Sequence, residues 1–223
     1  MQLTFHGHAC VALTDEGTRI VIDPGTYSDT AAALAGATGV LVTHDHADHV
    51  DAGPVVGALG LRPGLEVWAT GPAREVLLRA GAPADRVHET TPGETFRVGD
   101  ATVTAGGGRH AEIHRDVPRA VNVTYLVRLG GTSVYHPGDS FELPPPVEGG
   151  VDVLLTPVSA PWLKMGEVID FTRATPARIV VPVHDAFLSE LGHALTARWL
   201  DTPNRLGGAH AYVRLAQGES WHS

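Results

Sequence analysis

Residues that could hold metal ions are concentrated in one short segment. The stretch LVTHDHADHVDA, residues 41–52, contains three histidines and three aspartates directly after an apolar run. Within it, His44, His46, Asp48 and His49 form the pattern H-x-H-x-D-H. Imidazole and carboxylate groups suit Zn²⁺, Mn²⁺ and Fe²⁺, and alternate residues of a short loop can face two adjacent ions. The segment therefore predicts a metal site in preference to a solvated polar loop.

Three further candidate ligands follow apolar or glycine-rich runs elsewhere in the chain. His110 follows TAGGGR, Asp139 follows SVYHPG, and His184 follows IVVPV. A single histidine in such a place is more often a hydrogen-bonded structural residue, but the combination with residues 41–52 favours metal ligands. In RHAEIHRD, both His110 and His114 could bind metal. We favour His110 because it directly follows the glycine run.

A mixed α/β fold would position these residues. Apolar segments bounded by turn residues predict strands over 2–14, 18–23, 39–44, 94–107, 122–139, 151–157, 177–186 and 210–218. Helical patterns cover 29–37, 71–81, 166–174 and 189–200. Two sets of strands with helices outside both predict a four-layer α/β/β/α sandwich. The candidate ligands then follow strand ends, where ligands of α/β sheets usually bind.

Composition sets limits on the class of protein. The chain has 223 residues, 43% of them hydrophobic, and a formal charge of −9, which fits one soluble domain over 1–223. The negative charge argues against nucleic-acid and anionic-membrane partners. Since Cys10 is the single cysteine and the first residues lack signal-peptide features, we expect a cytoplasmic protein. The oligomeric state stays open.

Five segments in order, FHGHACV, VIDPG, VTHDHADHVD, YHPGDS and VPVHDA, resemble the metallo-β-lactamase fold hydrolases over nearly the whole chain. Among these the chain is similar to the small ascorbate-phosphate lactonase-like members, although SAPWLKMGEVIDF departs from their pattern. The resemblance implies two sets of ligands: His44, His46 and His110 for one metal, Asp48, His49 and His184 for a second, and Asp139 bridging both. It also implies two divalent ions, with zinc preferred and manganese or iron as alternatives.

A centre of this kind implies two-metal hydrolysis. Two divalent ions lower the pKa of a bridging water, so that a metal-bound hydroxide can attack a small ester, lactone or phosphodiester. Asp48 is expected to orient this water as well as to bind metal. Asp23 is expected to hold a ligating imidazole through a hydrogen bond, whereas His8 fits this role and a structural role equally. The alternative is a non-hydrolytic metal-binding or redox member of the same fold.

The segment TPVSAPWLKMGEV follows a predicted strand whose end should face the same crevice as His184. Trp162 offers an apolar surface and Lys164 a positive charge, which would suit a small-molecule substrate with an anionic group. The alternative is that Trp162 packs in the core and Lys164 is solvated. The sequence does not decide between these interpretations.

Overall fold

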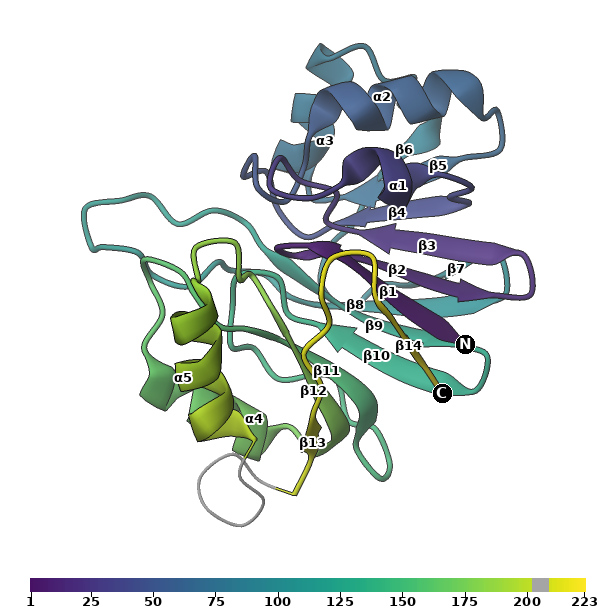
Figure 1. The fold of residues 1–223 in the computed structure, drawn as a ribbon. Helices are drawn as coiled ribbons and strands as arrows, with labels where there is room; N and C mark the ends of the chain where they lie inside the picture. The colour runs from purple at the N-terminus through teal and green to yellow at the C-terminus, as the bar shows by residue number, and fades with distance from the viewer. Residues whose placement is uncertain (202–208) are drawn as a thin grey trace.

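Within residues 1–201 and 209–223, which the computed structural model describes, two seven-stranded sheets pack face to face. Helices cover the outer side of each sheet (Figure 1). The four-layer α/β/β/α sandwich expected from the sequence is confirmed. None of the helices in the described parts of the chain has the length and apolar character of a membrane span.

The first sheet has the strand order β14-β1-β2-β3-β4-β5-β6. Its strands are β1 (Gln2–Gly7), β2 (Cys10–Asp15), β3 (Thr18–Ile22), β4 (Gly39–Val42), β5 (Glu66–Ala69), β6 (Val87–Glu89) and β14 (Ser220–His222). Neighbouring strands from β3 to β6 are parallel, so their carboxyl ends lie at one edge. The outer face packs against α1 (Thr30–Leu34), α2 (Ala52–Leu61) and α3 (Gly71–Arg79) through buried apolar side chains.

The second sheet has the strand order β13-β12-β11-β10-β9-β8-β7. Its strands are β7 (Thr95–Val98), β8 (Ala101–Gly107), β9 (Val123–Leu129), β10 (Thr132–His136), β11 (Val151–Pro157), β12 (Ala177–Val183) and β13 (Ala211–Tyr212). Strands β10 to β13 are parallel. Two helices, α4 (Met165–Ala174) and α5 (Glu190–Leu200), lie together on the outer side of this sheet (Figure 1).

The main hydrophobic core lies between the sheets, where alternate residues of the strands face each other. Leu13 and Ile22 of the first sheet and Val127 and Val181 of the second belong to this cluster and are fully buried. Near the edge that carries the candidate ligands, the Tyr125 hydroxyl donates to the carbonyl of Val42 at 3.1 Å. This hydrogen bond joins β9 to the end of β4, so the two sheets are held together beside the site.

Several sequence-based boundaries are wrong. Residues 2–14 form a hairpin of two strands because the chain reverses at His8–Ala9, directly after Gly7, whose φ of +102° is easy only for glycine. Segments 94–107 and 122–139 likewise each contain an antiparallel pair, and the strand expected over 210–218 is only β13. The helix α2 was not predicted, because its glycines and proline are poor helix formers.

Candidate metal centre

The seven predicted ligands come together at one edge of the sandwich. Four lie between β4 and α2, and the others follow β8, β10 and β12. Together with His8, they form two groups of four residues, and the candidate ligand atoms of each group lie within 4.8 Å of one another. The first cluster is His44, His46, His110 and Asp139, and the second cluster is His8, Asp48, His49 and His184.

In the first cluster, backbone and side-chain acceptors orient the imidazole rings. His44 donates from Nδ1 to the Thr43 hydroxyl oxygen at 3.0 Å, and His110 donates from Nδ1 to the carbonyl of Ala111 at 2.6 Å. In a neutral ring the Nε2 atom then carries the lone pair. His44 Nε2 lies 3.0 Å from His46 Nδ1. Burial lowers the pKa of both His44 and His46, which keeps these rings neutral and able to bind metal.

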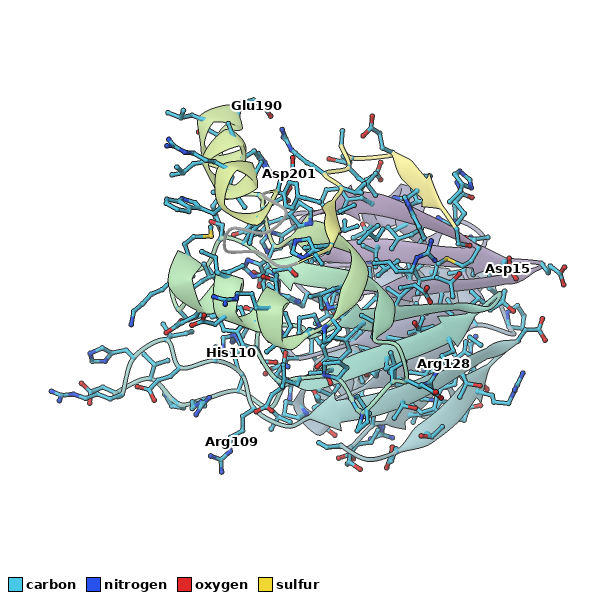
Figure 2. The ribbon with its side chains drawn as sticks, turned by 90° about the horizontal axis from the view of Figure 1, so that it is seen from below. Asp15, Arg109, His110, Arg128, Glu190 and Asp201 are labelled. Atoms are coloured by element: carbon cyan, nitrogen blue, oxygen red, sulfur yellow. The ribbon has the colours of Figure 1, made fainter. Side chains whose placement is uncertain are left out.

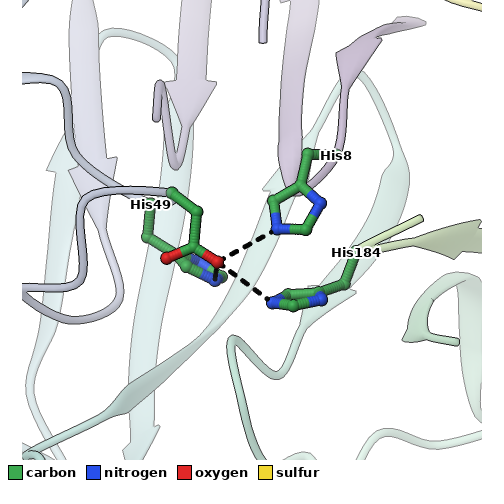
Figure 3. Close-up of side chains that lie close together, drawn as sticks. His8, His49 and His184 are labelled. Atoms are coloured by element: carbon green, nitrogen blue, oxygen red, sulfur yellow. Dashed lines mark hydrogen bonds and ion pairs between the residues drawn. The ribbon is translucent and has the colours of Figure 1, made fainter. Parts of the chain in front are cut away.

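The second cluster is oriented in the same way. His49 donates from Nδ1 to Asp23 Oδ2 at 2.7 Å, and His184 donates from Nδ1 to the carbonyl of Ser159 at 2.6 Å. Figure 3 shows His8, His49 and His184 pointing toward one carboxylate, that of Asp48. The Nε2 atom of His184 lies 3.5 Å from Asp48 Oδ2. In both clusters these rings therefore direct Nε2, the nitrogen opposite the donating Nδ1, to a common interior space.

Asp139 lies between the two clusters. Its Oδ2 is 3.2 Å from His110 Nε2, while its Oδ1 is 3.1 Å from His49 Nε2 and 3.2 Å from His184 Nε2. Burial would raise the pKa of Asp139, but the surrounding histidines outweigh burial and hold it well below its usual range. Asp139 is therefore an ionised carboxylate with one oxygen toward each cluster, as a bridging ligand requires.

The donor set fits divalent metal ions. Among the described residues, the buried atoms His49 Nε2, His110 Nε2, His184 Nε2 and Asp139 Oδ1 have no well-aligned hydrogen-bond partner. Unpaired buried polar atoms cost about 1–3 kcal/mol each, so a fold rarely gathers four in one place without a ligand. The unpaired atoms are also those that neutral imidazole and carboxylate ligands would direct at metal.

His8 supports this centre without the geometry of a ligand. Its Nδ1 accepts a hydrogen bond from the Ala186 N–H at 3.3 Å, so the neutral ring carries its proton on Nε2. This Nε2 donates to Asp48 Oδ2 at 3.2 Å. The His8 carbonyl also accepts from the His184 N–H at 2.7 Å. Of the two interpretations left open by the sequence, the geometry favours a residue that positions Asp48 and His184.

Asp23 connects the two clusters through Thr43. Its Oδ1 accepts from the Thr43 N–H at 2.8 Å, and its Oδ2 accepts from the Thr43 hydroxyl at 2.7 Å and from His49. Because the Thr43 hydroxyl donates to Asp23, it accepts from His44. Asp23, His8 and His184 have positive φ angles of 50°, 53° and 57°. Such strained backbone is typical of functional sites, where surrounding contacts hold it.

Several residues that hold the ligands were not predicted from the sequence. Thr43 directly precedes His44, which could have drawn attention to its hydroxyl. Asn122 accepts from the Asp139 N–H at 3.0 Å, and Arg119 donates from Nε and Nη2 to the His110 carbonyl at 2.9 and 2.7 Å. The last two lie in a segment without a motif, so no local signal identifies them.

The loop after β8 separates His110 from His114. In Figure 2 the neighbouring Arg109 points outward, whereas His110 is buried within the first cluster. His114 is exposed and its ring accepts from the Asp116 N–H at 3.2 Å. The structure therefore brings His110 to the centre and leaves His114 away from it.

Trp162 has a role that neither sequence-based interpretation included. It is only 8% exposed, and its indole N–H donates to Asp139 Oδ2 at 3.1 Å. Lys164 has an 83% exposed side chain and lies 3.8 Å from a Glu167 carboxylate oxygen. All three of Trp162, Lys164 and Glu167 line a cavity of about 420 Å³ beside the first cluster. Substrate contact by Trp162 or Lys164 stays a prediction.

Comparisons with known proteins agree with this geometry. Residues 2–184 match the family model described as a beta-lactamase superfamily domain. Protein Rv0786c of Mycobacterium tuberculosis is 36% identical over 191 residues, covering 85% of this chain and 86% of its own. A UPF0173 metal-dependent hydrolase of Methanoregula boonei is 31% identical over 204 residues, covering 82% of each chain. The structure of Igni18, a metallo hydrolase of Ignicoccus hospitalis, has a TM-score of 0.70 at 18% identity, covering 99% and 97% of the chains.

The fold and the two histidine–aspartate clusters define a metallo-β-lactamase fold enzyme. The chain belongs to the metallo-β-lactamase superfamily and is a metal-dependent hydrolase. The nearer similarity to ascorbate-phosphate lactonase-like members stays a prediction.

Proposed function

We propose that the protein is a binuclear metal-dependent hydrolase of a small ester, lactone or phosphodiester. Zinc is the preferred metal, because five imidazoles and two carboxylates form the ligand set. The observation that carries the proposal is the convergence of unpaired, buried ligand atoms from both sheets on one space. We also propose a cytoplasmic location, which a free and buried Cys10 supports.

Two bound divalent ions would lower the pKa of water and polarise the bond to be cleaved. Asp139, which lies between the two clusters, would supply negative charge to hold these ions. Asp48 is suited to orient the attacking water by accepting a hydrogen bond from it, because its side chain is 22% exposed while the histidines around it are buried. Burial would raise the pKa of Asp48, but hydrogen bonds from His184 and His8 lower it, so Asp48 is ionised at neutral pH.

Metal content tests the binuclear centre. Protein reconstituted with Zn²⁺ or Mn²⁺ should bind two ions per chain at saturation, measured by elemental analysis after removal of free metal. His110→Ala should lose metal from the first cluster, whereas His114→Ala, a matched change in the same loop, should keep both ions. A single ion at saturating metal, or metal loss in His114→Ala instead, would contradict the assignment.

Substrate class is tested with a panel of lactones, esters, thioesters and phosphodiesters assayed with each metal. We expect metal-dependent hydrolysis of at least one class, lost in Asp139→Asn because the bridging charge is removed. A coloured, iron-containing protein that hydrolyses none of these compounds would favour the redox alternative.

A further inference from the structure

An exposed pair of aromatic rings lies beside the second cluster. Tyr27 is 51% exposed and Phe187 is 59% exposed. Their rings meet edge to face, with centroids 5.6 Å apart. Each also contacts the ring of His8, at centroid distances of 5.3 Å for Tyr27 and 5.8 Å for Phe187. Since His8 donates to Asp48, a single side chain separates this pair from the candidate metal ligands.

The position of the pair is tied to the centre by the backbone. Tyr27 lies in the loop that begins at Asp23, after β3 of the first sheet, and Phe187 lies in the loop that begins at His184, after β12 of the second. The Thr26 N–H donates to the carbonyl of Ala47, within the ligand loop, at 2.9 Å. Next to Phe187, the Ala186 N–H donates to His8. The two sheets thus bring one ring each to the same side of the second cluster.

This pair differs from other exposed apolar side chains because it lies beside the candidate metal ligands. Leu61 is also exposed, but it lies at the end of α2 that is farther along the chain from the ligand loop. Isolated apolar side chains on a surface need no explanation, whereas neighbouring aromatic rings at a site favour a ligand. An edge-to-face pair leaves ring faces free, and a third ring or a branched alkyl group gains both buried area and ring contacts there.

We propose that Tyr27 and Phe187 form a subsite that binds an aromatic or bulky apolar group of the substrate. When this group is bound in the subsite, the bond to be cleaved lies against the two clusters. This inference rests on the proposed hydrolase function and narrows its substrate class to esters, lactones or phosphodiesters that carry such a group.

Two phosphonates test the subsite without turnover. Phenylphosphonate and methylphosphonate share an oxyanion that metal ions bind, and they differ in the ring. Isothermal titration of the zinc-loaded protein should give about tenfold tighter binding of phenylphosphonate, because part of its ring is removed from water. Phe187→Ala and Tyr27→Ala should each reduce this preference and leave the affinity for methylphosphonate unchanged. Tyr27→Phe, which keeps the ring, should retain the preference.

Leu191→Ala is the matched control, since it removes an 80% exposed apolar side chain close to Phe187 in sequence but on α5. It should behave as the unmodified protein, and metal content should be equal in every variant. Equal affinities for the two phosphonates, or a phenyl preference that persists in Phe187→Ala, would overturn the subsite. If the preference depends on Phe187 but no compound of the panel is hydrolysed, the proposed ester, lactone or phosphodiester activity fails while the subsite stands.

Discussion

Replacing Asp23 with asparagine should weaken metal binding although Asp23 is not itself a candidate ligand. The carboxylate accepts three hydrogen bonds, two from Thr43 and one from His49. An asparagine has one acceptor oxygen, so its NH₂ group must face at least one of these donors. The change also removes the negative charge that favours Nδ1–H on His49 and leaves its Nε2 free for metal.

The expected loss follows from the number of ligands that Asp23 orients. Loss of such a partner of a metal ligand typically costs 10–100-fold in metal affinity, which is about 1.4–2.7 kcal/mol. Because Asp23 contacts His49 directly and His44 through the Thr43 hydroxyl, one ligand of each cluster is affected. Both ions should therefore bind more weakly, with the second cluster affected at least as strongly as the first.

Competition with a chromophoric zinc chelator measures both affinities, and thermal unfolding of the metal-free proteins reports any separate loss of stability. Asp29→Asn is the matched control, since the Asp29 carboxylate accepts from the Ala32 N–H at the start of α1 and from no candidate ligand among the described residues. It should leave zinc affinity unchanged. Wild-type zinc affinity in Asp23→Asn, or an equal loss in the Asp29 variant, would refute the role of this network.

Trp162→Phe keeps an aromatic ring but removes the donor to Asp139; we expect roughly 10–100-fold weaker metal binding by chelator competition, and an unchanged affinity would show that the ring alone matters. His8→Ala should lower the turnover number and the metal content of the second cluster, because Asp48 loses a hydrogen bond; full activity with two ions would contradict this. Burial would lower the pKa of His184, but hydrogen bonds to Asp139 and Asp48 raise it to about 9. Metal must displace that proton, so zinc affinity should fall by about tenfold per pH unit per proton as pH drops below 9, and a pH-independent affinity would argue against His184 as a ligand.

Local sequence was enough to predict the fold class and the residues that meet at the centre. The H-x-H-x-D-H segment and the histidines at strand ends carry this information because ligand type and strand position are both local properties. The predicted four-layer fold then requires these strand ends to share an edge. Element boundaries were less predictable: residues 2–14 show one alternating apolar pattern, and the positive φ angles of Gly7 and His8 turn it into a hairpin.

Only the tertiary structure decided how the candidate ligands are held. The partners of Asp139 include Trp162 and Asn122, which lie 23 and 17 residues away along the chain and belong to segments without a motif. For His8, the choice between holding candidate ligands and a plain structural role depends in part on the Ala186 N–H, 178 residues distant. The hydrogen-bond partner of each ring, and with it the ring tautomer, is set by groups that come together only in the folded chain. The sequence shows composition and hydrophobic periodicity but not these long-range contacts.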